Sequence, residues 1–175
     1  MRASRFVALW VVLGVVLASP GFACTTSHLA SDAAYLALAP VLAFVAEGRI
    51  GDRGGAATFE LDLGQETAAP ATTAQYNWMS GQSEPFTVAY EAATGLVSFT
   101  LGGHTLQYVA TGTLTDVFVR TRAINAGSSV AVSGLVLDGV SVGDGSSCDA
   151  VSGVDYLRIE GGGLADGFVL TGTAV

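Results

Sequence analysis

The chain has 175 residues, half of them hydrophobic, with seven arginines, no lysine, and fifteen aspartates and glutamates. Beyond residue 23, five arginines stand against fifteen carboxylates, which gives a net charge of −10. Such a surface repels nucleic-acid phosphates and anionic lipid headgroups, so nucleic-acid binding and polybasic membrane docking are excluded. The apolar content is high enough for a hydrophobic core, and the length suits one domain preceded by an export signal.

Residues 1–23 have the pattern of a secretory signal peptide. Two arginines precede an apolar run of thirteen residues, Phe6 to Ala18, and Gly21-Phe22-Ala23 places small residues at the exit. Thirteen apolar residues are too few to cross a bilayer, which takes about twenty. We therefore expect cleavage after Ala23, no transmembrane span in the mature chain, and a secreted, extracellular or outer cell-surface location.

The two cysteines leave three alternatives open. Cys24 would be the first residue after cleavage, the position that is acylated in bacterial lipoproteins, although Gly21 and Phe22 match that recognition pattern poorly. Export also favours a disulfide between Cys24 and Cys148, which would close a loop worth about 4–5 kcal/mol in the chain-entropy model. The third alternative is two unpaired thiols.

Residues 24–43 are expected to form a lead-in segment before the main domain. It is rich in alanine and leucine, with Ser31-Asp32 as a candidate helix cap before Ala33–Ala39 and Pro40 as a stop. We expect either a short helix or an extended segment here.

Residues 44–175 have the pattern of an all-β domain. Segments of about six residues rich in Val, Phe, Tyr, Thr and Leu alternate with glycine-bearing turns. The expected strands are Phe44–Ile50, Thr58–Leu63, Ala74–Met79, Phe86–Tyr90, Leu96–Leu101, Thr105–Val109, Asp116–Arg122, Val130–Leu137, Tyr156–Glu160 and Gly167–Gly172.

The alternation of apolar and polar residues, together with the turn residues, indicates which kind of β architecture to expect. Leu96–Leu101 alternates apolar and polar residues, as does Phe59–Leu63, whose carboxylates Glu60 and Asp62 are expected to face outward. Asp138-Gly139 predicts a two-residue hairpin turn, and Gly95 a longer one. We therefore expect a single β-sandwich, mostly antiparallel and jelly-roll-like.

Several dispersed motifs resemble one bacterial domain family. They are Phe44-Val45-Ala46-Glu47-Gly48-Arg49-Ile50-Gly51-Asp52, Phe59-Glu60-Leu61-Asp62-Leu63-Gly64, Gln75-Tyr76-Asn77-Trp78 with Gly81-Gln82, Pro85-Phe86-Thr87, Thr100-Leu101-Gly102-Gly103, Thr115 to Ala123, and Asp155-Tyr156-Leu157-Arg158-Ile159. Over about residues 40 to 172 the chain resembles the choice-of-anchor W family. The resemblance implies an exported, β-rich surface domain whose members carry different carboxy-terminal sorting tails. No such tail precedes Val175, so we expect either release as a soluble protein or anchoring through Cys24.

Catalytic signals are sparse. The two histidines, His28 and His104, belong to no nucleophile motif, and the lack of lysine excludes Schiff-base chemistry and a phosphate-loop lysine. Glu60 and Asp62 lie about 7 Å apart along one strand face, within the range of paired glycosidase carboxylates. Polar residues on an outward face are ordinary, however, and we expect no enzyme.

Acidic loops suggest a calcium site as the one candidate cofactor. Asp144 and Asp149 bracket a loop rich in oxygen donors, and Asp155 and Asp166 could fold near it. Oxygen ligands in loops suit Ca²⁺, although ordinary turn chemistry explains the same residues.

An aromatic pair suggests a glycan-binding platform. On the predicted strand Ala74–Met79, Tyr76 and Trp78 would share one face, with the amides of Asn77 and Gln82 beside them. The alternative is that both rings belong to the core.

Two functional classes follow from these patterns. The first is a non-catalytic secreted or cell-surface module with a structural or adhesive role, with an extracellular glycan or another surface protein as its partner. The alternative is an extracellular hydrolase that acts on polysaccharide through paired carboxylates.

Overall fold

The computed structural model describes residues 24–50, 60–65, 69–161 and 163–175. The predicted signal peptide, and residues 58 and 59 of one predicted strand, lie outside these residues. In chain order the elements are β1 (Cys24–Leu29), α1 (Asp32–Leu36), β2 (Val45–Gly48), β3 (Leu61–Gly64), β4 (Thr72–Ala74), β5 (Glu84–Glu91), β6 (Leu96–Leu101), β7 (His104–Val109), β8 (Asp116–Arg122), β9 (Ser129–Leu137), β10 (Val140–Ser141), β11 (Ser146–Asp149), β12 (Val154–Gly161), the 3₁₀ turn η1 (Leu164–Asp166) and β13 (Phe168–Ala174).

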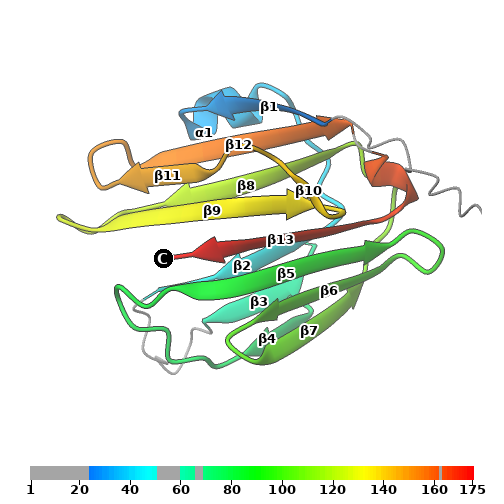
Figure 1. Ribbon diagram of the computed structural model, residues 1–175, viewed down its shortest axis with the longest axis horizontal. Helices are drawn as coiled ribbons and strands as arrows, with labels where there is room; N and C mark the ends of the chain where they lie inside the picture. The colour runs from blue at the N-terminus through cyan, green and yellow to red at the C-terminus, as the bar shows by residue number, and fades with distance from the viewer. Residues whose placement is uncertain (1–23, 51–59, 66–68, 162) are drawn as a thin grey trace, which may run out of the picture.

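The strands form two layers. One layer is a seven-stranded sheet in the order β10-β9-β13-β5-β6-β7, with β11 also paired to β9. The other layer holds two three-stranded sheets, β1-β12-β8 and β2-β3-β4, and β2 to β4 lie behind β5 to β7 in Figure 1. All of these pairings are antiparallel.

A single hydrophobic core lies between the layers. Leu61 and Leu63 from β3 and Leu157 and Ile159 from β12 are each at most 1% exposed, and they belong to the same cluster as Val97 of β6. The chain passes from β8 to β9, and later from β12 to β13, each time from one layer to the other, as in a jelly roll. The prediction of an all-β sandwich is confirmed.

Local patterns predicted many elements well. The strands β6 and β8 have the predicted bounds, and buried residues alternate along β6. Asp138 and Gly139 both have positive φ, as a type I′ hairpin turn requires. Ser31 caps α1 by accepting a hydrogen bond from the Ala34 N–H at 3.1 Å, and the helix ends at Leu36, before the predicted Ala39.

Two segments differ from expectation. The predicted strand Ala74–Met79 is wrong, because β4 ends at Ala74 and residues 75–79 form an irregular segment. The predicted lead-in 24–43 contributes β1, which pairs with β12 over six residues. Residues 24–29 therefore belong to the sandwich, because the edge of β12 offers backbone partners that their local composition does not reveal.

Candidate functional site

His28 lies between two carboxylates where the edge strand β1 meets the loop before β11. Its Nδ1 is 3.0 Å from Asp155 Oδ1, and its Nε2 is 3.2 Å from Asp144 Oδ2. Only a doubly protonated imidazolium can donate to both. The hydrogen bond to Asp155 raises the pKa of His28 above its usual 6.5, and Asp144 adds to this effect, while burial opposes it.

The same carboxylates continue a polar network into the sandwich. Ser146 Oγ donates to Asp155 Oδ2 at 2.8 Å and is 2.9 Å from Thr121 Oγ1, so that β11 of one layer is joined to β12 and β8 of the other. Thr26 donates to Asp144 at 3.2 Å. Ser146 is bonded to a carboxylate and not to the imidazole, so these side chains do not form a nucleophile–base pair.

The His28 contacts predict a pH-dependent stability. Because the pKa is higher in the folded state, the stabilisation is fully present below pH 6.5 and is lost as the pH rises through the raised value. His28→Gln should remove this dependence, with an effect of less than about 1 kcal/mol because the side chain is 42% exposed. Urea unfolding between pH 5 and 8.5 measures it.

His104→Gln is the matched control, since the His104 ring contacts Tyr76 and has no carboxylate bonded to it among the described residues. If the free energy of unfolding changes with pH in the same way for His28→Gln and for the wild type, the contacts of the His28 imidazolium with Asp144 and Asp155 do not stabilise β1.

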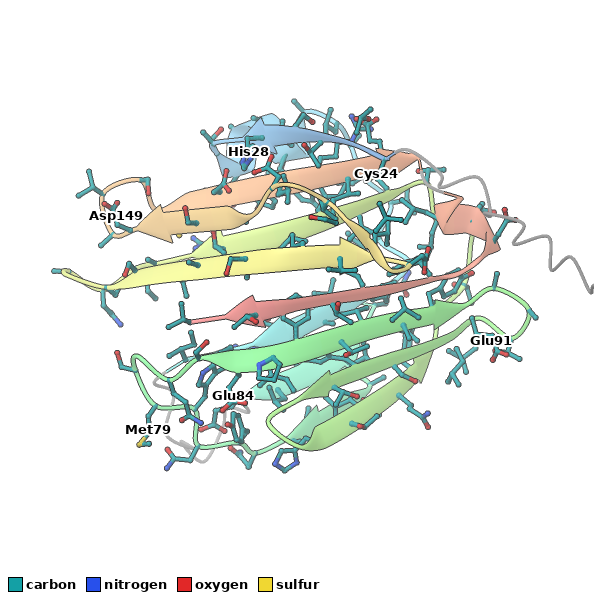
Figure 2. All side chains as sticks on the ribbon, in the orientation of Figure 1. Cys24, His28, Met79, Glu84, Glu91 and Asp149 are labelled. Atoms are coloured by element: carbon teal, nitrogen blue, oxygen red, sulfur yellow. The ribbon has the colours of Figure 1, made fainter. Side chains whose placement is uncertain are left out.

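The four aspartates predicted to bind calcium do not converge. Asp144 and Asp155 meet at His28, but Asp149 accepts the N–H groups of Val151 and Ser152 in its own turn. Hydrogen bonds from Ser152 lower the pKa of Asp149. Asp166 belongs to η1, on the right of Figure 1, whereas Asp149 lies on the left of Figure 2. Within the described ranges, no group of three or more His, Cys, Asp or Glu side chains is arranged to hold a metal ion.

The predicted disulfide is wrong, because Cys24 and Cys148 are both free thiols. Cys24 pairs with Gly161, at the C-terminal end of β12. Cys148 lies near the other end of β12, because the carbonyl of its neighbour Asp149 accepts the Gly153 N–H there. Gly161 lies eight positions after Gly153 along this extended segment, roughly 25 Å away. Figure 2 shows Cys24 and Asp149 at opposite ends of the sandwich. Acylation of Cys24 stays a prediction.

The prediction that Glu60 and Asp62 face solvent is wrong, because each residue is only 2% exposed. Asp62 bonds to Arg49 Nη2 at 2.7 Å, and Glu47, its cross-strand neighbour, contacts the same nitrogen at 3.1 Å. Burial raises the pKa of Asp62 to about 6, with a contribution from Glu47 and opposition from Arg49. Glu60 accepts the backbone N–H of Tyr76 at 3.2 Å. Both faces of β3 are therefore covered, and neither carboxylate can reach a polysaccharide.

The predicted aromatic platform is only partly present. Trp78 is 3% exposed, and its indole N–H donates to the Gln82 carbonyl at 2.9 Å, so this ring belongs to the core. Tyr76 is half-buried and lies over Gly102, where a Cβ would come within 2.4 Å of Tyr76 Cζ. Asn77 remains exposed.

The structure adds two residues, Glu84 and His104, to the aromatic platform that the sequence predicted. The Tyr76 hydroxyl donates to Glu84 at 2.5 Å and accepts from the Gln82 amide at 2.9 Å, and that amide also contacts Glu84. The His104 ring lies 5.7 Å from the Tyr76 ring. We define the Tyr76 patch as Tyr76, Asn77, Gln82, Glu84 and His104. The sequence signal for His104 was the Gly102-Gly103 turn directly before it, since the Tyr76 ring packs on Gly102 and β7 begins at His104.

Comparison with protein-family models, with characterised proteins and with solved structures finds no match to this chain. Among the described residues, no helix has the length and apolar character that a membrane span requires.

Proposed function

We propose that this chain is a non-catalytic module of the cell exterior, secreted or held at the outer surface, with an adhesive role in which the Tyr76 patch binds glycan. The exported location rests on the signal-peptide pattern, and the choice-of-anchor W resemblance supports the same assignment. The observation that carries the binding role is the gathering of an aromatic ring, two amides, a carboxylate and an imidazole around one loop.

The non-catalytic part of the proposal rests on how the candidate reactive groups are engaged. Both nitrogens of His28 contact carboxylates, so the N–H groups of its imidazolium are bonded within the protein and not to a reacting group. Glu60 and Asp62 are buried and are bonded to groups of the protein itself. Glu60 and Asp62 are therefore closed to a substrate, and His28, which is 42% exposed, is engaged by carboxylates of the protein itself.

The chemistry of the Tyr76 patch suits a saccharide. Sugars present apolar C–H faces that pack on aromatic rings and hydroxyls that bond to amides and carboxylates. The bonds among Tyr76, Gln82 and Glu84 hold these side chains in place before any ligand arrives, which lowers the entropic cost of binding. Asn77 is exposed and makes no hydrogen bond to another described side chain, so its amide is available.

A glycan array compares the wild type with the double variant Asn77→Ala/His104→Ala. We expect the wild type to bind a subset of polysaccharides and the double variant to lose about tenfold in affinity, since two ligand contacts are removed. Asn125→Ala, an exposed asparagine in the β8–β9 loop, is the control and should bind like the wild type. The adhesive role is wrong if the wild type binds no glycan, or if the double variant binds as tightly as the control.

A further inference from the structure

Residues 36–42, which are the last residue of α1 and the six that follow it, form an exposed apolar loop that the glycan-binding proposal does not use. The exposed fractions are 67% for Leu36, 44% for Leu38, 96% for Val41 and 38% for Leu42. No charged residue occurs between Asp32 and Glu47. In a chain with a net charge of −10 beyond residue 23, this loop is a neutral, aliphatic part of the surface.

The loop has a rigid base. Tyr35, in the helix that precedes it, stacks on Tyr156 with ring centroids 4.5 Å apart and meets Phe118 edge-on at 5.1 Å. The Tyr156 hydroxyl donates to Asp32 at 2.6 Å. These contacts fix α1 against the sheet β1-β12-β8 (Figure 1). The exposed residues after Leu36 therefore extend from a helix whose position is fixed.

Stability alone does not explain this loop. Exposed aliphatic side chains gain nothing from burial, and Ala39 adopts φ +47°, a left-handed conformation that costs an alanine free energy. In the described residues the one other such non-glycine is Asp138, in a hairpin turn where this conformation is expected. Two departures from local preference in one short loop indicate an interaction surface.

The exposed apolar area and the net charge of the chain indicate whether a second copy or a lipid surface covers this loop. The four side chains expose on the order of 400 Å² of apolar surface, about half of what each partner of a stable protein interface contributes. A second copy of the chain carries the same charge of −10, which opposes association. A lipid surface requires neither a large complementary face nor an opposite charge, because a few aliphatic side chains can enter the boundary between headgroups and acyl chains.

We propose that residues 36–42 insert into the interfacial region of a membrane with zwitterionic headgroups. Val41, the most exposed side chain, enters deepest, and the acidic remainder of the surface stays in water. Figure 1 shows α1 along one edge of the sandwich and β7 along the other, and Figure 2 places Glu84 on the β7 side. Docking through the loop would therefore leave the Tyr76 patch facing away from the lipid.

Local quenching by brominated phosphatidylcholine vesicles tests the insertion in the mature chain, residues 24–175, because the apolar run of an uncleaved signal peptide would itself bind vesicles. Val41→Trp introduces a reporter at the loop, and Val151→Trp introduces one at a site that is 95% exposed in the turn after β11. Trp78, the one tryptophan beyond residue 23, is common to both variants, so the wild-type emission is subtracted. We expect the residue-41 signal to shift to the blue and to be quenched, while the residue-151 signal stays unchanged.

A partition assay with plain phosphatidylcholine vesicles supplies the second readout. Val41→Asp should lower the bound fraction about fivefold relative to Val151→Asp, because a carboxylate resists entry into the interface. Attachment through another part of the chain would bind vesicles without quenching at residue 41, and that result overturns the proposal. Self-association without lipid that Val41→Asp abolishes also overturns it, in favour of a second copy.

Discussion

Replacing Trp78 with alanine is expected to lower the free energy of unfolding by about 3–5 kcal/mol. The ring is 3% exposed and belongs to the central hydrophobic cluster, and it packs so closely on Gly48 that a Cβ there would lie 2.9 Å from the indole. The variant also leaves the Gln82 carbonyl without its 2.9 Å donor. Urea unfolding followed by circular dichroism measures the loss.

Met79→Ala is the matched control, because this neighbour is 53% exposed and should change the stability by no more than about 0.5 kcal/mol. The comparison separates the two roles that the sequence allowed for Trp78. Unchanged stability together with weakened saccharide binding would place the indole on the surface and contradict its position in the core.

Wild-type stability should fall as the pH rises from about 4 to 6, through the titration of Asp62. Its pKa is about 6 in the folded protein against 3.8 ordinarily, so the native state holds a proton that the unfolded state has released. The stabilisation is present below pH 3.8 and is lost above pH 6. Relative to Asp62→Asn, which does not titrate, the wild type should lose up to about 3 kcal/mol across this interval.

The measurement is the free energy of unfolding at a series of pH values for the wild type, Asp62→Asn and Asp166→Asn. Asp166 is exposed on η1, so its variant should follow the wild-type curve. Parallel curves for the wild type and Asp62→Asn would mean that Asp62 titrates as an exposed carboxyl does, and that its burial is wrong.

The sequence by itself determined the features that depend on near neighbours. Alternation along Leu96–Leu101 predicted a strand with one buried face, because successive side chains point to opposite sides of a sheet. Asp138-Gly139 predicted a hairpin, and Ser31 a helix start, because these residues favour the required backbone conformation or supply the missing acceptor. Such signals sum to an all-β sandwich without any knowledge of its packing.

The tertiary structure decided what covers each face. Alternation assigns Glu60 and Asp62 to one side of β3, but it cannot show that this side is also enclosed, since the covering groups come from other segments. His28 lies 116 residues from Asp144 and 127 from Asp155, and only the pairing of β1 with β12 and the approach of the loop before β11 bring them together. The same pairing holds Cys24 away from Cys148, which no cysteine spacing reveals. Contacts of this kind depend on which strands become neighbours, and that is settled by burial of the whole core and not by any local pattern.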